Sequence, residues 1–291
     1  MSGYEHHGEP YSAEQCGTVK SVLGSDKLIF VIKVGTSSLV RSEQHTLNLT
    51  NLARICETVL KLKNLGHHVV IVTSGAVGMG CQCLKLATRP TEVAKKQALA
   101  AVGQVLLMKY YVDFLGALDV KCAQVLLTWE NIADKDQFYN ARNTFAQLLA
   151  YGVVPVVNEN DTVAVQELRF GDNDTLSAKV AALVEADYLF LLTDVDCLYT
   201  ANPRDDPNAK PIWEVHDMDN LMTRVDTGGG AKGSQWGTGG MATKLTAARI
   251  ATEAGCKMVI ANSEKPDSII EIGIHEAQER GTIFHPKPRV N

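Results

Sequence analysis

The chain has 291 residues, of which 45% are hydrophobic, so its composition is that of an ordinary globular protein with a sizeable core. Its formal net charge is -5 at pH 7, which argues against nucleic acid or an anionic membrane as a partner, because both select clustered Lys and Arg. Small anionic substrates remain possible, since they need only a local cationic pocket.

The cysteines indicate a reduced, cytoplasmic protein. There are seven, an odd number, and they lie in apolar segments without a C-x-x-C or a paired Cys and His spacing. Cys81 and Cys83 could form a soft-metal pair, but two further ligands are missing nearby, so we expect no dedicated metal site. No apolar run approaches the length that a transmembrane span needs.

The first 27 residues form a polar segment with several glutamates and no arginine. A secretory signal needs an apolar stretch and a transit peptide is rich in arginine, so neither fits. We expect a disordered leader over residues 1–27, which includes His6 and His7.

The first half of the chain alternates buried strands with helices. A β-branched run at 28–34 predicts a strand, and the apolar spacing at 49–66 predicts an amphipathic helix that stops at Gly66. The patterns that follow predict a strand from 68 that ends in a glycine turn, a long helix around 91–117, a strand at 120–128, a helix at 140–152 and a strand at 153–161.

The second half continues the alternation. It begins with a hairpin or excursion at 163–174. The elements predicted after it are a helix at 173–186, a strand at 187–199, a turn region near 202–207, a helix at 241–255, a strand at 256–262 and a final helix near 266–279. Strands that are apolar on both faces and separated by helices predict a three-layer α/β/α sandwich with a mainly parallel central sheet.

Polar and glycine clusters follow several of these strands, and this is the main sign of an enzyme. They read KVGTSS after the first strand, TSGAVG after the second, NEND after the fourth and TDVD after the fifth. Ligands of open parallel sheets bind at the carboxyl ends of the strands, so we expect the active site there.

Two lysines are candidate anion ligands. Lys33 is the only charge in its apolar strand, where it either pairs with an anion or extends to solvent. Lys244 falls in the first turn of a helix after several glycines, where the backbone N–H groups and the helix dipole favour an anion. The alternative for Lys244 is an ordinary surface lysine, and its position at a helix start favours the anion site.

A helix start rich in carboxylates and amides is the third candidate. One of Asp172, Asn173 and Asp174 must cap the helix, and the others, together with Asn158 and Asp161, could grip an amino group or hold the two lysines. Thr193 and Asp194 end a strand where a nucleotide base or ribose could bind. No histidine stands in a Ser/His/Asp or Cys/His arrangement.

The glycine-rich segment 226–245 contains G-x-G-x-x-G, but no strand precedes it as a dinucleotide-binding unit requires. No G-x-x-x-x-G-K-[ST] occurs, so an ordinary P-loop is excluded. We predict that GTGGMATK is the nucleotide-binding part and that residues 226–236 form a mobile flap.

These clusters together resemble the glutamate 5-kinases of the amino-acid kinase superfamily. The motifs are VIKVGTSSLV, VIVTSGAVGMG, KQALAAVGQ, NARNT, VVPVVNENDTVAV, FGDNDTLSA, LLTDVDCLYTANPR and GTGGMATKLTAA. The resemblance implies one amino-acid kinase domain over 28–288, with a glutamate-binding lobe at about 28–180 and an ATP-binding lobe at about 181–288. The pair GDNDTLSA and GTGGMATK separates this family from acetylglutamate, aspartate and uridylate kinases.

The resemblance implies transfer of a phosphoryl group from MgATP to the γ-carboxylate of L-glutamate, which gives L-glutamyl 5-phosphate, the first step toward proline. It assigns catalysis to Lys33, Lys244 and Asp174. It assigns glutamate binding to Ser74, Gly75, Asn158, Asp161, Asp172 and Asn173, and ATP binding to Lys33, Thr193, Asp194, Thr238, Gly239, Gly240, Met241, Ala242, Thr243 and Lys244. Mg²⁺ would be held mainly by ATP phosphates and water.

The resemblance also implies feedback inhibition by proline, a separate glutamyl phosphate reductase and a homodimer or homotetramer. We expect a form without the C-terminal PUA domain of many bacterial relatives, and Arg169 stands where relatives often have lysine. Two alternatives remain: a related kinase acting on another acid, such as acetylglutamate or aspartate, and a catalytically idle sensor of proline or glutamate.

Overall fold

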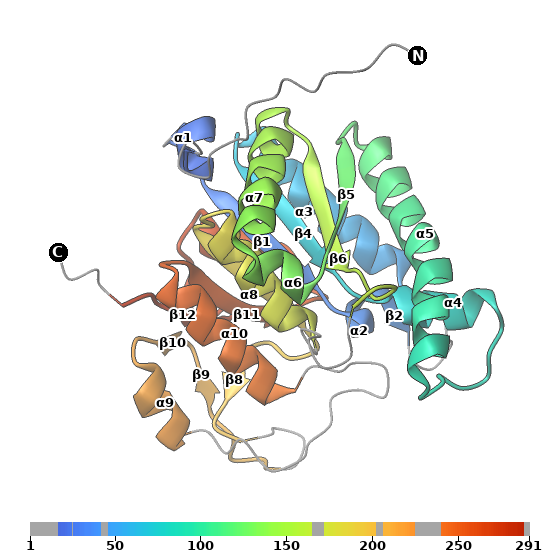
Figure 1. Cartoon of the computed structure of the whole chain (residues 1–291). Helices are drawn as coiled ribbons and strands as arrows, with labels where there is room; N and C mark the ends of the chain where they lie inside the picture. Colours follow the sequence, from blue (N-terminus) through green and yellow to red (C-terminus); the bar gives the residue numbers. More distant parts are fainter. Residues whose placement is uncertain are drawn as a thin grey trace.

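A single large sheet forms the centre of the molecule. The computed structural model describes residues 17–24, 26–41, 46–164, 172–201, 206–224 and 240–287. Its strands are β1 (Ile29–Val34), β2 (Val40–Arg41), β3 (Thr46–Leu47), β4 (His68–Thr73), β5 (Cys122–Leu127), β6 (Val154–Glu159), β7 (Tyr188–Thr193), β8 (Leu198–Tyr199), β9 (Pro211–Ile212), β10 (Glu214–Val215), β11 (Lys257–Asn262) and β12 (Thr282–Phe284). Eight of these strands form the sheet, in the order β10-β12-β11-β7-β1-β4-β6-β5 (Figure 1).

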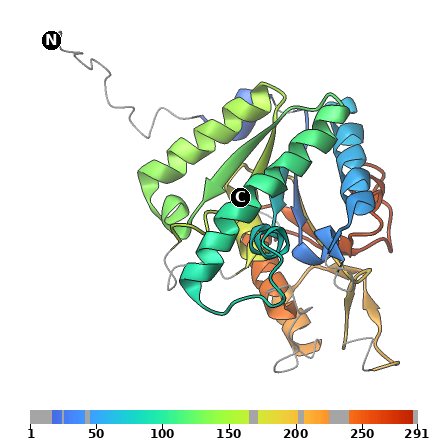
Figure 2. The ribbon, with the colours of Figure 1, turned by 90° about the vertical axis from the view of Figure 1, so that its right-hand side faces the viewer.

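Helices cover both faces of this sheet (Figure 2). They are α1 (Val19–Leu23), α2 (Thr36–Leu39), α3 (Leu49–Asn64), α4 (Ala76–Cys83), α5 (Val93–Ala117), α6 (Trp129–Ala133), α7 (Lys135–Ala150), α8 (Asn173–Leu183), α9 (Met218–Arg224), α10 (Met241–Glu253) and α11 (Ser268–Gly273). One core lies between the sheet and α3, α4, α5 and α11, and the other between the sheet and α7, α8 and α10. The predicted three-layer α/β/α class is confirmed.

The central strand β1 shows why the sheet is buried on both sides. Ile29 and Val31 face the core of α7, α8 and α10, whereas Phe30 and Ile32 face the core of α3, α4 and α5. Side chains alternate between the two faces of a strand, so a run that is apolar at every position needs cover on each face.

The polar clusters predicted to form the site do share one edge of the sheet. β1 pairs in parallel with both β4 and β7, and β6 pairs in parallel with β4. The carboxyl ends of these four strands therefore point the same way. Two edge strands run the other way, because β12 is antiparallel to β11 and β10 is parallel to β12.

The structure contains a helix that the sequence analysis did not predict, and another helix is shorter than predicted. The glycine turn after β4 continues directly into α4, and the final helix ends at Gly273 rather than near residue 279. A Cβ on Gly273 would lie 2.5 Å from the ring of Phe30, so a glycine is needed where α11 meets the core. Glu276 and Glu279 then adopt positive φ values of 51° and 59°, which a continuing helix excludes.

The prediction that residues 1–27 are disordered is wrong for residues 17–24. Thr18 caps α1 by accepting a hydrogen bond from Ser21 N at 3.0 Å, and Val19 is fully buried. The helix packs against α7, where Arg142 donates to the Gly17 carbonyl at 2.8 Å. One buried valine in a short polar segment produces no helical periodicity, so the sequence pattern did not reveal this contact. Residues 1–16 lie outside the described residues.

Helix α5 is long and apolar enough, by length and composition, to cross a membrane, which corrects the sequence-based expectation. It is the single such helix among the described residues, and core helices pass the same test. Tyr111 and Leu115 on α5 are fully buried in the protein core, whereas Val105 and Val112 are exposed. The packing of Tyr111 and Leu115 identifies α5 as a helix that covers the sheet.

Glycines allow α4 and α5 to cross in close contact. A Cβ on Gly103 of α5 would lie 1.8 Å from the carbonyl oxygen of Ala76, and a Cβ on Gly80 of α4 would lie 2.0 Å from that of Leu99. No larger residue fits either position without separating the helices. This crossing sets the position of the turn between β4 and α4, which carries Ser74 and Gly75.

Candidate active site

Two lysines meet one buried carboxylate at the carboxyl edge of the sheet. Lys33 Nζ lies 2.6 Å from Asp174 Oδ1, and Lys244 Nζ lies 3.2 Å from Asp174 Oδ2. The side chain of Asp174 is 1% exposed, against 11% for Lys33 and 12% for Lys244. The three predicted catalytic residues are thus brought together. The two lysine side chains are more exposed than the carboxylate between them.

Each member of this triad comes from a different element. Lys33 is near the end of β1, Asp174 is in the first turn of α8 and Lys244 is in the first turn of α10. Helices α8 and α10 pack against each other, and small residues such as Ala178 and Ala247 lie in that core. The close approach of the two helices brings Asp174 within reach of Lys244.

The electrostatics of the triad keep Asp174 ionised. Burial by itself raises the pKa of this carboxyl group, but the positive charges of Lys33 and Lys244 outweigh burial and lower its pKa from 3.8 to about 2. With both lysines protonated, the triad carries a net positive charge. A buried cluster with this excess charge favours an anionic ligand.

Thr243 belongs to the same cluster, although the resemblance assigned it to ATP. Its hydroxyl lies 3.2 Å from Asp174 Oδ2 and 2.8 Å from the Gly240 carbonyl. Gly35 adjoins the cluster, and a Cβ there would be in van der Waals contact with Lys33 Nζ at 3.4 Å.

A second cluster centres on the amide of Asn173. Its Nδ2 lies 2.6 Å from the Thr73 carbonyl, 2.9 Å from Ser74 Oγ and 2.8 Å from Asn158 Oδ1. Three of the predicted glutamate-binding residues are therefore in contact, and they come from the ends of β4 and β6 and the start of α8. Since Asn173 and Asp174 are adjacent in sequence, this amide cluster lies directly beside the lysine triad.

The amide cluster continues through two residues that the sequence analysis missed. Asn158 Nδ2 donates to Gln104 Oε1 at 2.9 Å, and Gln104 Nε2 donates to Gln124 Oε1 at 2.9 Å. Asn158 is buried, so an acceptor for its amide is required. Gln104 lies within the KQALAAVGQ motif, which was a signal for its importance, but nothing in the sequence indicated its partner.

The turn between β4 and α4 needs a glycine. Gly75 has φ 108°, a conformation that disfavours residues with a Cβ, and it forms the N-cap of α4. Ser74 N donates to the Val34 carbonyl at 3.0 Å, which ties the turn to the end of β1. Behind it, the buried Tyr111 hydroxyl donates to Thr73 Oγ1 at 2.9 Å.

Two further predicted glutamate ligands are carboxylates. Asp172 caps α8 by accepting from Thr175 N at 2.8 Å, so the cap that the sequence required is this residue. Burial, with a smaller effect from the charge of Asp174, raises the pKa of Asp172. Asp161 lies half-buried in the turn after β6, close in sequence to Asn158.

The predicted ATP residues occupy two places at the same edge. Thr193 ends β7, is largely buried and lies next to the exposed Asp194. Gly240 is the N-cap of α10, and Met241, Ala242 and Thr243 form its first turn. Thr238 and Gly239, the predicted flap 226–236 and Arg169 lie outside the described residues.

The fold is that of a known class of protein. Residues 29–262 match the amino acid kinase family, so the chain belongs to that family. Its relatives include the glutamate 5-kinase of Synechococcus elongatus, which is 54% identical over 89% of this chain and 69% of the relative. The glutamate 5-kinase of Rippkaea orientalis is 52% identical over 90% of this chain and 70% of the relative. Within the amino acid kinases, the chain therefore belongs with the glutamate 5-kinases, as its motifs predicted.

Solved structures support the fold. A carbamate kinase from Giardia lamblia bound to AMP-PNP is similar with a TM-score of 0.64 and 14% identity, over 89% of this chain and 99% of that one. A UMP kinase from Ureaplasma parvum is similar with a TM-score of 0.58 and 17% identity, over 89% of this chain and 99% of that one. At these identities the similarity shows the fold alone.

Proposed function

We propose that the protein transfers the γ-phosphoryl group of ATP to the γ-carboxylate of L-glutamate and forms L-glutamyl 5-phosphate. The observation that carries this proposal is the position of Asp174 between Lys33 and Lys244, directly beside the amide of Asn173. A cationic cluster for phosphates thus adjoins a polar cluster for a small acid. The sequence identity to glutamate 5-kinases supports glutamate as that acid.

The arrangement suits phosphoryl transfer because this reaction depends on positioning and charge neutralisation. A γ-carboxylate oxygen attacks the terminal phosphorus, the bond from that phosphorus to the bridging oxygen breaks, and ADP leaves with the bond electrons. Lys33 and Lys244 neutralise the negative charge on the transferring group and the leaving oxygen. The attacking carboxylate is already ionised at neutral pH, so no general base is needed.

Asp174 is an organiser of the two lysines in this proposal. Since its pKa is about 2, it is a poor proton acceptor at neutral pH. Its negative charge lets two ammonium groups stay close together without a substrate, and both of its oxygens face them. A carboxylate engaged in this way is poorly suited to bind Mg²⁺, so we propose that Mg²⁺ enters on ATP, held by phosphate oxygens and water.

Glutamate has three charged groups that the second cluster can recognise. The hydroxyl of Ser74 and the amides of Asn158 and Asn173 offer donors to its carboxylates, whereas Asp161 and Asp172 offer negative charge to its ammonium group. The turn at Gly75 lets the backbone approach the substrate closely. This division orients the γ-carboxylate toward the lysines.

ATP binds, in this proposal, across the ends of β7 and α10. The α10 N-terminus offers backbone N–H groups to the phosphates, and Lys33 and Lys244 add positive charge there. Thr193 and Asp194 contact the base or ribose, and residues 238–244 follow the phosphates. The idle-sensor alternative is disfavoured because both catalytic lysines are present and paired with Asp174.

Further expectations follow from the family. Proline is a candidate feedback inhibitor, and a glutamyl phosphate reductase would consume the product, because an acyl phosphate is labile. We also propose a homodimer or homotetramer in the cytoplasm. A proline titration tests the first expectation, since proline should raise the glutamate concentration needed for half-maximal rate.

Hydroxamate trapping of the acyl phosphate tests the activity. Glutamate and MgATP should give γ-glutamyl hydroxamate in proportion to ADP release. Acetylglutamate and aspartate in the same ADP-release assay separate this activity from that of related kinases, because a preference for either would reject glutamate as the substrate. Binding of glutamate without any turnover would instead support the sensor alternative.

A further inference from the structure

Two histidines and a glutamate meet at the β10 edge of the sheet, away from the active site. β10 and β12 pair in parallel, with Val215 opposite Phe284, and His285 N donates to the Val215 carbonyl at 2.9 Å. Residues two apart on a strand share a face, so Glu214 and His216 project together. His216 follows Val215 and His285 follows Phe284, so the two histidines are neighbours at the ends of β10 and β12.

The ligand atoms of these three side chains converge. His216 Nε2 lies 3.1 Å from Glu214 Oε2, and His285 Nε2 lies 3.9 Å from the same oxygen. The two imidazole rings stack with centroids 4.3 Å apart and planes at 14°. One ligand atom from each residue lies within 4.8 Å of both others.

A second observation is that one nitrogen of this cluster has no hydrogen-bond partner in the described part of the protein. His285 Nε2 is buried and has no hydrogen-bond partner among the described residues. A buried ring nitrogen without a partner is costly, because its interaction with water is lost and not replaced.

We propose that Glu214, His216 and His285 bind a divalent transition-metal ion, for which Zn²⁺ is the best match. Two imidazole nitrogens and one carboxylate oxygen are a ligand set typical of Zn²⁺, Co²⁺ and similar ions, whereas Mg²⁺ and Ca²⁺ prefer oxygen ligands. Tetrahedral bonds of about 2.0–2.1 Å place ligand atoms about 3.3 Å apart. The 3.1 Å contact already matches this separation, whereas the 3.9 Å contact must shorten and the stacked imidazole rings must rotate before both nitrogens can bind one ion.

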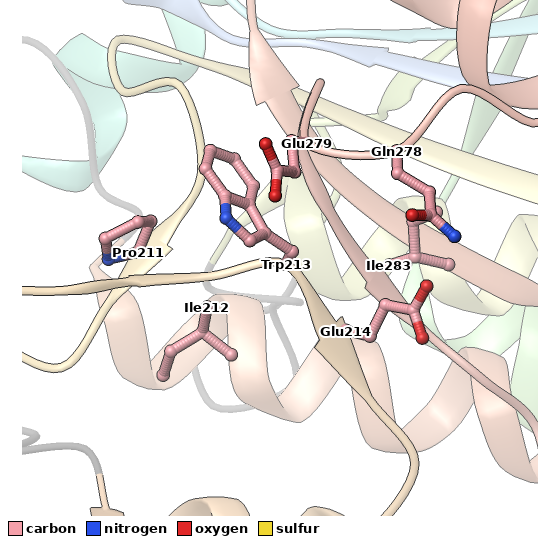
Figure 3. Close-up of a pocket in the computed structure, with 7 residues that line it drawn as sticks. All are labelled: Pro211, Ile212, Trp213, Glu214, Gln278, Glu279 and Ile283. Atoms are coloured by element: carbon pink, nitrogen blue, oxygen red, sulfur yellow. The ribbon is translucent and has the colours of Figure 1, made fainter.

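A groove lies beside the carboxylate of this cluster. Glu214 also lines a groove of about 470 Å³ together with Gln278, Glu279 and Ile283 (Figure 3). A second carboxylate in the same groove, that of Glu279, adds negative charge that favours a cation. Water can complete the coordination from this side, or a small anionic ligand can.

The proposed site is separate from the phosphoryl-transfer site, so the inference does not depend on the proposed function. β10 is four strands away from β1 in the sheet, so strands about 4.8 Å apart separate the two sites by roughly 19 Å across the sheet alone. A metal ion here would connect the end of β10 to the end of β12. It would therefore stabilise the edge of the ATP-binding lobe through binding to the folded state.

The test uses the full chain after removal of metals with a chelator, titrated with Zn²⁺ by calorimetry and with Co²⁺ by visible absorption. We expect the unaltered protein to bind Co²⁺ with the absorption of nitrogen and oxygen ligands, and Zn²⁺ to raise the thermal midpoint. His285→Asn and Glu214→Gln should each weaken binding by at least about tenfold and remove the thermal shift. Glu214→Gln keeps the side-chain shape, so it protects the test against a folding defect.

His275→Asn is the matched control, because His275 is an exposed histidine outside the cluster. This variant should bind both ions as the unaltered protein does. Unchanged binding in His285→Asn and Glu214→Gln would overturn the proposal. So would a loss confined to a His6→Asn/His7→Asn double variant, or Co²⁺ absorption dominated by thiolate ligands.

Discussion

Asp174 controls the charge of the candidate active site at the scale of a single residue. Its carboxylate contacts two lysines from different elements, and without it these ammonium groups would repel each other. The lysines in turn keep the carboxylate ionised. Each member of the triad is therefore needed for the position and charge of the other two, and substitutions within it should act together rather than additively.

Lys244→Ala should lower kcat by about 10²–10³-fold, because it removes one of two cations that stabilise the transferring phosphoryl group. Glutamate binding should stay measurable, since Lys244 does not contact Asn158 or Asn173. Steady-state kinetics and glutamate titration check both parts. Lys95→Ala, which removes a surface lysine paired with Glu92, is the control and should leave the rate unchanged. An unchanged rate in Lys244→Ala would contradict its assigned role.

The pKa of Asp174 predicts how stability changes in acid. Its folded-state pKa is about 2 and its ordinary value is 3.8, so its stabilising contribution is fully present above about pH 4 and is lost as the pH falls toward 2. The contribution is roughly 2 kcal/mol. Urea unfolding of the unaltered protein and Asp174→Asn at several pH values between 5 and 2 should show their difference shrinking across this window.

The pKa of Asp172 is shifted in the opposite direction, so its effect on stability must be separated from that of Asp174. Because burial raises its pKa, protonation of Asp172 as the pH falls favours the folded state. Comparison with Asp174→Asn removes the effect of burial on Asp172, which is present in both proteins, and leaves only the smaller effect of the Asp174 charge on Asp172. A difference between the two proteins that does not change with pH would contradict the assigned pKa.

Gln104→Leu should raise the KM for glutamate by up to about tenfold while kcat changes little, because the buried Asn158 amide loses its acceptor. Gln104→Glu retains an acceptor oxygen and should restore much of the affinity. Gln147→Leu, at an exposed position of α7, controls for the change in polarity. Equal effects of the Leu and Glu variants would show that the hydrogen bond to Asn158 does not position the substrate cluster.

At the scale of elements, the crossing of α4 and α5 determines where the Ser74 turn lies. The sequence pattern predicted α5 but not α4, and the distance between the two helices depends on two glycines. A turn mounted on such a crossing moves whenever the helices separate. Side chains in the crossing can therefore affect the substrate cluster without touching it.

Gly103→Ala should destabilise the protein by about 1–3 kcal/mol or more and also reduce activity, because its Cβ would overlap the Ala76 carbonyl. Gly116→Ala on the same helix is the matched control. A Cβ there meets nothing within 4 Å, so this change should be neutral or stabilise by up to about 1 kcal/mol. Thermal unfolding and ADP-release assays compare the two, and similar stabilities would contradict the close crossing.

At the scale of the whole molecule, the two predicted lobes share one sheet. The boundary predicted near residue 180 falls inside α8, whose first turn also supplies Asp174. The two cores lie on opposite faces of the same strands, and β1 contributes to both. The two lobes therefore differ in the ligand that each is proposed to bind, but they share one continuous packed structure.

This continuity predicts one cooperative unfolding transition. Urea unfolding followed by far-ultraviolet circular dichroism and by tryptophan fluorescence should give coincident curves. Trp129 packs against the core near α7 and Trp213 lies beside β10, so the fluorescence reports on both halves. Two separated transitions would show that the lobes unfold independently.

Most of the fold was predictable because its strands are apolar on both faces and glycines and helical periods separate them. The candidate site was predictable as a set of residue types, and the predicted catalytic residues Lys33, Lys244 and Asp174 do lie together. Gln104, the α1 contact through Val19 and the cluster of Glu214, His216 and His285 were missed. Each depends on a partner far away in sequence, and a local pattern contains no information about that partner.

The sequence by itself determined the sheet, its helical cover and the chemistry available at the strand ends. Buried strands need apolar residues at every position, and a lone lysine or a glycine turn stands out against that pattern. Only the tertiary structure decided the roles of the three neighbouring residues at the start of α8. Asp172 caps the helix, Asn173 bonds to Ser74 and Asn158, and Asp174 contacts the two lysines. Asp174 and Lys244 are 70 residues apart, and only the packing of α8 against α10 brings them into contact.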